Sequence, residues 1–454
     1  MNSTIAAIAT PAGRGAIAVI RLSGPDAPAI CQRHIHHPLQ PRRATFTPFL
    51  VGGKLLDEVV VVYFQSPHSY TGEEVVEISC HGSTYIQQRL LEALLADGCR
   101  MAEPGEFTRR AFLNGRLNLS QAEAVADLVD ATNRGAHQMS VSQLRGGYAA
   151  LLGELRERFV ELTSLLELEL DFSDEEVEFA DRSQLCDLLT TLIGRCRRLA
   201  DSFALGNAIR TGVPVAIIGP PNAGKSTLLN RLVGEERAIV SDQPGTTRDT
   251  VEETVTLDGI GFRFIDTAGI RHSDNQIEQA GIERSHRAAQ QAAIIVYVVD
   301  RGDTATLPRQ LADLSMAVPL QGKQIIVACN KSDRYGNTPL PTADSLGTND
   351  IDSLLPISAQ TGDGIDELLR RLTLRYRDQG DDAEPTVSNL RHYEALTRIV
   401  EASQRALDAL RQKLPADLVA IDLRDALHHL GTITGEVVPD EILGTIFSRF
   451  CIGK

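Results

Sequence analysis

The sequence predicts a mixed fold, α/β plus α, in which one α/β module is inserted into a helical region. Three observations favour this class. The chain has 454 residues, which is too long for one ordinary core and indicates about three domains. Between residues 211 and 374, short apolar runs alternate with helical patterns, as in buried parallel strands flanked by helices. Helical periodicity resumes on both sides of that stretch.

The N-terminal part, residues 1–116, predicts a compact α/β unit. Residues 16–22 and 59–64 are rich in apolar and β-branched side chains, as is typical of strands. Residues 83–98 show the spacing of an amphipathic helix that ends at Gly98.

Residues 117–210 and 375–454 predict two parts of one helical domain. Ser120 and Glu123 have the spacing of a capping box, in which the hydroxyl and the carboxylate each satisfy a free backbone N–H. Further helices are expected at 391–410, 420–430 and 440–450. The helical domain is therefore expected to be discontinuous in sequence.

The inserted module, residues 211–374, predicts a doubly wound sheet. Asp258-Gly259, between two strand-like segments, is a strong signal for a hairpin turn. The sheet should thus contain one antiparallel hairpin. Its strands are expected at 213–218, 262–265, 293–299, 324–329 and 354–358.

Composition narrows the class of protein. Hydrophobic residues make up 43% of the chain, and no apolar run is long enough for a membrane span. Seven scattered cysteines without a CxxC pair suggest reduced thiols in a cytoplasmic protein. The formal net charge of −15 is unusual for a protein that binds nucleic acid alone. Residues 167–181 hold eight carboxylates and no Lys or Arg, which is either a solvated segment or a surface for a basic partner.

A phosphate-binding motif follows the first strand of the inserted module. Residues 219–226 match G-x-x-x-x-G-K-S between a strand and a helix. In such a loop, backbone N–H groups surround phosphate oxygens. Lys225 is expected to contact the β and γ phosphates, and Ser226 to ligate Mg²⁺.

Three later motifs identify the base as guanine. Asp266-Thr267-Ala268-Gly269 is placed to reach Mg²⁺ and the γ-phosphate, and Ser358-Ala359-Gln360 fits the loop that backs the base. In Asn330-Lys331-Ser332-Asp333, the Asp333 carboxylate can accept hydrogen bonds from two guanine donors that adenine lacks. With the phosphate motif, these segments predict a Ras-like P-loop GTPase.

The residue after Asp266-Thr267-Ala268-Gly269 departs from the Ras pattern. Ras-type proteins place a water-orienting glutamine there, and this chain has Ile270. The protein is therefore either a slow switch or supplies another group. Asn222 and the oxygen-rich segment 241–247 favour a bound monovalent cation, which would neutralise charge in the transition state.

Several segments together resemble the bacterial and organellar tRNA modification GTPases, the MnmE or TrmE family. They are residues 10–24, 71–82, 104–128 and 244–249, the segment Asp266–Arg271, and the C-terminal Phe450-Cys451-Ile452-Gly453-Lys454. The resemblance covers the whole chain. It implies an N-terminal folate-binding-type domain, a homodimer joined through that domain, and a flavoprotein partner, MnmG or GidA, in a heterotetramer. With that partner, the family adds an aminomethyl-type group to C5 of the wobble uridine of certain tRNAs.

The resemblance also implies site residues. Glu278 would orient the attacking water, whereas the residues alone favour a solvated glutamate that begins a helix. Mg²⁺ ligands fall on Ser226 and Thr247, and K⁺ ligands on Asn222, Ser241, Gln243 and Thr246. The nucleotide would be bound by these residues with Ala223, Gly224, Lys225, Thr227, Asp242, Pro244, Gly245, Asp266, Thr267, Ala268, Gly269, Asn330, Lys331, Asp333, Ser358, Ala359 and Gln360.

For a reduced folate, either 5-formyl- or methylene-tetrahydrofolate, the resemblance implies Arg21, Glu77, Arg116 and Lys454. A carboxylate such as Glu77 can bind the amide and amino edge of a pterin, and cations suit the glutamate tail. Cys451 is either a reactive thiol or an inert small residue. His34, His36 and His37 lack partner carboxylates in sequence, so a loop is favoured over a metal site.

A scaffold that merely presents folate to a partner is disfavoured by the presence of Lys225, Asp266 and Glu278. Two other classes of function remain open at this level. One is a K⁺-stimulated GTP hydrolase that serves tRNA modification. The other is a regulatory GTPase that acts as a switch in ribosome assembly. A simple switch needs neither a folate-type N-terminal domain nor the C-terminal CIGK segment, and this favours the first class.

Overall fold

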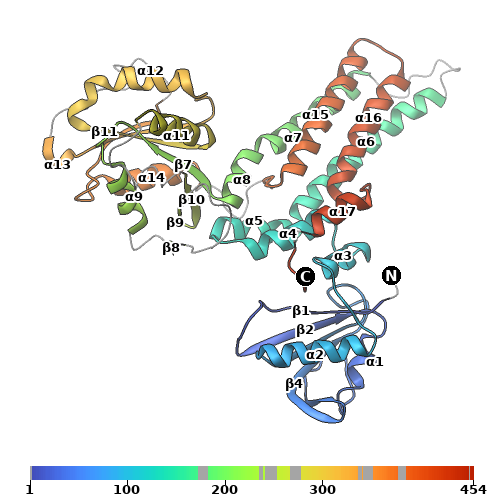
Figure 1. The fold of residues 1–454 in the computed structure, drawn as a ribbon. Helices are drawn as coiled ribbons and strands as arrows, with labels where there is room; N and C mark the ends of the chain where they lie inside the picture. The colour runs from blue at the N-terminus through green and yellow to red at the C-terminus, as the bar shows by residue number, and fades with distance from the viewer. Residues whose placement is uncertain are drawn as a thin grey trace. The chain divides into compact units, whose positions relative to one another are not determined.

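The computed structural model describes residues 3–171, 182–234, 239–240, 253–265, 278–335, 340, 351–376, 385–448 and 450–454. Contacts divide the chain into two compact units, drawn in Figure 1. The first consists of residues 1–129, 142–194 and 398–454, and the second of residues 130–141 and 195–397. Each is described by itself.

The first unit contains a six-stranded sheet with the strand order β3-β4-β5-β2-β1-β6. The helices α1 (Ala27–Gln32) and α2 (Thr84–Ala96) contribute buried side chains such as Ile30 and Leu90 to one core with the sheet. The predicted strands at 16–22 and 59–64 and the helix at 83–98 are confirmed. The strands are β1 (Ile5–Ile8), β2 (Ile17–Ser23), β3 (Thr45–Val51), β4 (Lys54–Phe64), β5 (Val75–His81) and β6 (Arg100–Met101).

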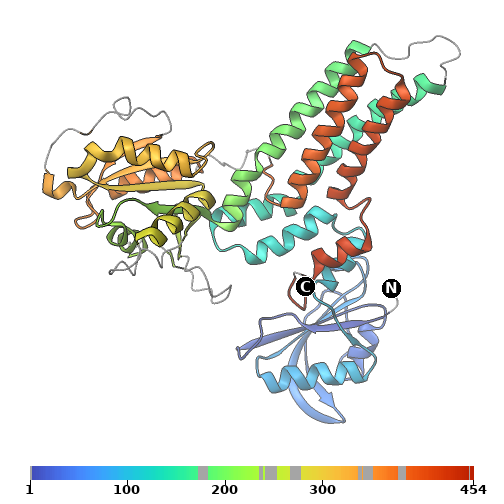
Figure 2. The same ribbon diagram turned by 45° about the horizontal axis from the view of Figure 1, so that its top comes forward.

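The rest of this unit is helical. In Figures 1 and 2 the long helices α6 (Gly147–Asp171) and α16 (Ala416–Thr434) run side by side. The predicted C-terminal helices are confirmed. The other helices are α3 (Glu106–Leu113), α4 (Leu119–Asp130), α7 (Arg182–Asp201), α15 (Leu390–Arg411) and α17 (Asp440–Phe447).

The capping box lies two residues earlier than the sequence analysis placed it. Asn118 Oδ1 accepts a hydrogen bond from the Gln121 N–H at 2.9 Å, and Gln121 Oε1 accepts one from the Asn118 N–H at 3.1 Å. The Ser120 hydroxyl donates to Asn118 Oδ1 instead of capping the helix. The prediction of Ser120 and Glu123 was therefore wrong, because an amide pair at the same spacing satisfies the same backbone groups.

The second unit is the predicted doubly wound module. Its strand order is β13-β12-β11-β7-β10-β9-β8, parallel from β13 to β10, with β9 antiparallel to its neighbours on both sides. The strands are β7 (Val213–Ile218), β8 (Ile239–Val240), β9 (Glu253–Leu257), β10 (Ile260–Phe264), β11 (Ile294–Asp300), β12 (Gln324–Asn330) and β13 (Ser353–Pro356).

Helices form two separate cores with this sheet. Leu228 of α9 (Lys225–Gly234) and Leu368 of α14 (Ile365–Leu374) belong to one buried cluster. Ala289 of α11 (Glu278–Gln291) and Leu311 of α12 (Leu307–Ala317) belong to the other. Figure 1 shows these pairs on different faces of the sheet. The other helices are α5 (Arg134–Leu144), α8 (Phe203–Thr211), η2 (Arg301–Thr306) and α13 (Ser332–Tyr335).

The hairpin between β9 and β10 turns at Asp258-Gly259, as predicted. Both residues have positive φ, 52° and 81°, which is the backbone geometry of a type I′ turn. The Gly259 carbonyl accepts a hydrogen bond from the Gly135 N–H at 2.9 Å, so the turn is tied to the start of α5.

All seven cysteines are free thiols. Within the described ranges, no helix combines the length and the apolar character that crossing a membrane requires.

Candidate functional site

The phosphate-binding loop connects β7 to α9 in the middle of the parallel strands. β7 lies between β11 and β10, and in open α/β sheets ligands bind at the carboxyl ends of such strands. A Cβ on Gly219 would lie 2.0 Å from the Val298 carbonyl oxygen, and one on Gly224 would lie 2.2 Å from Asn330 Nδ2. Both positions therefore require glycine. Asn222, in the same loop, has a left-handed φ of 61°.

Lys225 bends back over this loop. Its Nζ donates to the carbonyl oxygens of Gly219 at 2.9 Å and Pro220 at 2.8 Å. Burial lowers the pKa of the Lys225 ammonium. Both acceptors are neutral, so a phosphate would supply the negative charge that stabilises this cation. Ser226 and Thr227 follow in the first turn of α9.

The residues predicted to recognise the base contact the phosphate-binding loop. Asn330 ends β12, and its Nδ2 donates to the Ala223 carbonyl at 2.8 Å. Its Oδ1 accepts a hydrogen bond from the Ala359 N–H at 2.9 Å. The Ser358 hydroxyl donates to Asp333 Oδ1 at 2.7 Å, which orients that carboxylate. The structure thus brings together three segments that lie far apart in sequence.

Asp300 is a member of this region that the sequence analysis missed. Lys331 has a left-handed φ of 63°, and its Nζ donates to Asp300 Oδ2 at 2.7 Å. Desolvation raises the pKa of Asp300, but hydrogen bonds from Lys331 and the Gly302 N–H more than offset it, so the pKa is lowered. Its position in the sequence could have indicated this role, because Asp300 is an acidic residue at the end of β11, and β11 neighbours β12.

Other predicted residues lie outside the described ranges. They are Ser241, Asp242, Gln243, Pro244, Gly245, Thr246, Thr247, Asp266, Thr267, Ala268 and Gly269. Glu278 is the first residue of α11, and Gln360 follows Ala359 in the loop after β13.

In the first unit, Arg21 and Glu77 are paired across neighbouring strands. They are register partners on β2 and β5, and Arg21 Nε donates to Glu77 Oε1 at 2.9 Å. The Arg21 guanidinium also lies over the rings of Tyr70 and Phe107, 5.3 and 5.6 Å from their centroids. Arg21 therefore orients Glu77, whose carboxylate has further lone pairs for a ligand.

The C-terminal segment contacts Arg21 and Phe107 as well. The Gly453 carbonyl accepts from Arg21 Nη1 at 3.4 Å, and the Lys454 carbonyl accepts from the Phe107 N–H at 3.2 Å. A Cβ on Gly453 would lie 2.4 Å from the Ile8 carbonyl oxygen, so the close approach requires glycine. The Arg116 side chain packs beside Gly72, two residues from Tyr70.

The histidine-rich segment is not arranged for a metal ion. His34 Nδ1 lies 2.8 Å from the Leu50 carbonyl oxygen, and its ring stacks on Phe49. Among the residues that the structure describes, no group of His, Cys, Asp and Glu side chains is placed to hold a metal ion.

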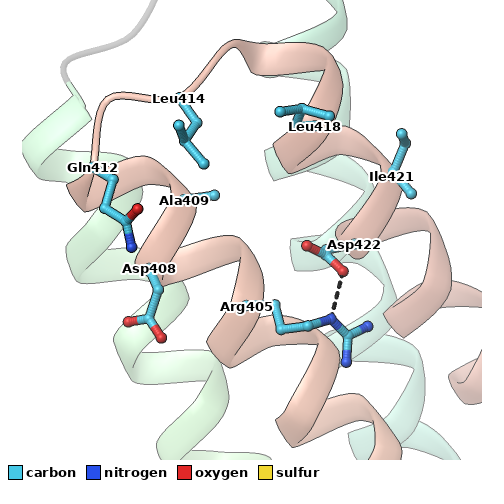
Figure 3. A pocket seen from close by; sticks show the side chains of 8 residues that line it. All are labelled: Arg405, Asp408, Ala409, Gln412, Leu414, Leu418, Ile421 and Asp422. Atoms are coloured by element: carbon cyan, nitrogen blue, oxygen red, sulfur yellow. Dashed lines mark hydrogen bonds and ion pairs between the residues drawn. The ribbon is translucent and has the colours of Figure 1, made fainter.

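A cavity of about 460 Å³ lies between α15 and α16 (Figure 3). Arg405 donates to Asp422 at 2.8 Å across it, and Leu414, Leu418 and Ile421 form its apolar side. Of the predicted site residues that the structure describes, none lines this cavity.

Two family models match the chain. The model described as the MnmE helical domain matches residues 119–451, and that of the GTP-binding protein TrmE N-terminus matches residues 4–116. A GTP-binding protein from Sulfolobus solfataricus, solved with GDP, is 18% identical, over 50% of this chain and 68% of that one. Its TM-score is 0.29, so the fold assignment does not rest on it.

Curated relatives match from end to end. The tRNA modification GTPase MnmE of Parabacteroides distasonis is 48% identical, with 100% of both chains covered. That of Flavobacterium johnsoniae is 46% identical, over 100% of this chain and 99% of the relative. These matches agree with the nucleotide motifs and with the C-terminal segment seated on the N-terminal sheet. The chain therefore belongs to the MnmE family of tRNA modification GTPases.

Proposed function

We propose that this chain hydrolyses GTP to GDP and phosphate, and that the reaction serves modification of the wobble uridine of certain tRNAs. The observation that carries the proposal is the convergence of the phosphate loop, the Asn330–Asp333 segment and the Ser358–Gln360 loop through direct hydrogen bonds. Ser358 donates to the Asp333 carboxylate, which would accept hydrogen bonds from guanine, and Lys225 lies against the loop that would bind the phosphates.

Two metal ions belong to the proposal, and of their proposed ligands the structure describes Ser226 and Asn222. Mg²⁺ would be held by Ser226 and Thr247 and would neutralise phosphate charge. K⁺ would be held by Asn222, Ser241, Gln243 and Thr246, and hydroxyl, amide and carbonyl oxygens suit such a cation. Glu278, at the start of α11, would orient the attacking water in place of the Ras-type glutamine that Ile270 replaces.

A reduced folate is the proposed ligand of the first unit. Arg21 contacts Glu77, whose carboxylate would accept hydrogen bonds from a pterin edge, and the half-buried Tyr70 would offer aromatic surface beside it. Lys454 and Arg116 would attract the negatively charged glutamate tail. The folate would supply the one-carbon unit that is transferred to the uridine.

Two protein partners follow from the family. The first is a second copy of the chain, bound through the N-terminal sheet, where Phe46 of β3 and its register partner Val60 of β4 are exposed. The second is the flavoprotein MnmG, or GidA, in a heterotetramer. The flavin would carry the electron transfer, for which the GTPase motifs offer no group.

The test is mass spectrometry of tRNA nucleosides from cells that lack the protein. The wobble-uridine modification should disappear, return with the unmutated gene, and stay absent with Lys225→Ala. Purified protein should hydrolyse GTP and leave ATP intact.

The rival function, a ribosome-assembly switch, predicts a different result. Cells that lack the protein would keep normal tRNA nucleosides and accumulate unfinished ribosomal subunits. That outcome would overturn the proposed function and leave the GTPase assignment in place.

A further inference from the structure

One arginine links the phosphate-binding helix to the loop that backs the base. α9 begins at Lys225, and Arg231 lies six residues later on the same helix, about 9 Å along its axis. Arg231 Nε donates to the Ala359 carbonyl at 3.2 Å, and its Nη2 donates to the next carbonyl, that of Gln360. A planar guanidinium with several fixed donors suits two adjacent acceptors, which the single ammonium of lysine matches less well.

The loop held by Arg231 is also held from its other side. The Ala359 N–H donates to Asn330 Oδ1, and Asn330 Nδ2 donates to the Ala223 carbonyl in the phosphate loop. Ala223 and Arg231 flank the first turns of the same helix. The hydrogen bonds therefore form a closed ring from Ala223 through Asn330 and Ala359 to Arg231 and back along α9.

We propose that Arg231 is a positioning residue for guanine recognition, which fixes the Ser358–Gln360 loop against the phosphate-binding helix. The inference rests on the proposed GTPase function and extends it to a residue outside the nucleotide motifs. Without Arg231, two carbonyls of the loop lose their anchor, while Ser358 keeps its contact with Asp333. The loop then samples more conformations, and the bound base is held less tightly.

The consequence is specific to nucleotide binding. Phosphate contacts through Lys225 remain, so the chemical step at saturating GTP should keep its rate. A residue that positions the base in ground state and transition state alike changes KM and dissociation rather than kcat. Loss of a residue needed only for folding would lower the unfolding temperature without raising KM selectively over kcat.

The experiment compares the full-length chain with Arg231→Gln and Arg231→Lys. Stopped-flow fluorescence measures dissociation of a fluorescent GDP analogue, and steady-state assays with Mg²⁺ and K⁺ give KM and kcat for GTP. Arg231→Gln should dissociate about tenfold faster and raise KM about tenfold, with kcat within about twofold, because hydrogen bonds from a charged donor are lost. Arg231→Lys should lie between Arg231→Gln and the unmutated chain.

Arg375→Gln is the matched control. Arg375 Nη1 donates to the Gly322 carbonyl at 3.4 Å, before the start of β12, whereas Asn330 lies at the end of that strand. The Arg375→Gln variant should release the fluorescent GDP analogue at the same rate as the unmutated chain. The proposal would be overturned if both Arg231 variants kept the dissociation rate and the KM of the unmutated chain. It would also be overturned if Arg375→Gln raised the dissociation rate and KM as much as Arg231→Gln does. Failure of the unmutated chain to bind GDP would instead overturn the proposed function.

Discussion

Asn222 adopts a left-handed backbone, with a φ of 61°, inside the phosphate loop. Its amide is the one member of the proposed K⁺ ligand set within the described residues. Asn222→Ala should lower the K⁺-stimulated rate while GTP binding persists, because a stabiliser of transition-state charge adds little to ground-state affinity. Initial rates in KCl and in NaCl measure this. Equal rates of the unmutated protein in both salts would contradict the cation proposal.

Glu278 is the proposed water-orienting residue at the start of α11. Because such a role is typically worth about 10²–10⁴-fold in rate, Glu278→Ala should reduce kcat by that order and leave GTP affinity nearly intact. Single-turnover hydrolysis and nucleotide titration separate the two effects. Glu283, exposed on the same helix, is the control and should tolerate alanine. A parental rate in Glu278→Ala would place the catalytic group elsewhere.

At the scale of residues, the sequence predicts the roles of the motif residues, whereas it does not predict which side chains contact one another. Lys225, Asn330 and Asp333 belong to motifs whose spacing is set by the ligand, so their roles follow from order alone. Arg231 and Asp300 belong to no motif, and their partners lie 128 and 31 residues away. Likewise, nothing in the sequence indicates that Arg21 would bind Glu77 instead of remaining an unpaired cation.

At the scale of elements, Gly259 makes the hairpin turn between β9 and β10. Its φ is 81°, and an added Cβ would lie 2.8 Å from the Arg134 Cβ. A left-handed conformation costs a residue with a Cβ about 1–2 kcal/mol. Gly259→Ala should therefore lower the unfolding temperature in a thermal melt.

Gly153 in α6 provides the opposite control. A Cβ there meets no atom within 4 Å, and alanine is favoured over glycine in a helix by about 0.5–1 kcal/mol. Gly153→Ala should raise the unfolding temperature or leave it unchanged. If Gly259→Ala also raised it, the turn geometry assigned to the hairpin would be wrong.

Element positions were predictable where local signals were strong. The buried strands have few polar residues, and Asp258-Gly259 fixes the hairpin. The start of α4 was misplaced because Asn118 and Gln121 offer the same capping chemistry as Ser120 and Glu123, and local sequence does not rank the two pairs. The seat of the C-terminal segment on the N-terminal sheet depends on contacts between residues more than 400 positions apart, such as Arg21 and Gly453.

At the scale of the whole molecule, the proposed homodimer should depend on the exposed sheet face. Phe46 is 62% exposed and stands opposite Val60, so Phe46→Glu would place a charge in an apolar contact. Sedimentation velocity should show monomers for this variant and dimers for the unmutated chain. Met316→Glu on α12, 79% exposed, is the control and should stay dimeric. A dimeric Phe46→Glu protein would move the interface elsewhere.

The most direct test of the account is the base specificity set by Asp333. Guanine presents two donors to this carboxylate, whereas the C2 carbonyl of xanthine accepts a hydrogen bond. Hydrolysis of GTP and of xanthosine triphosphate is measured for the unmutated chain and for Asp333→Asn. The account predicts that the variant loses GTP turnover at low substrate and gains turnover of xanthosine triphosphate. An Asp333→Asn protein that keeps the parental KM for GTP would contradict the assignment of this site as a guanine-nucleotide site.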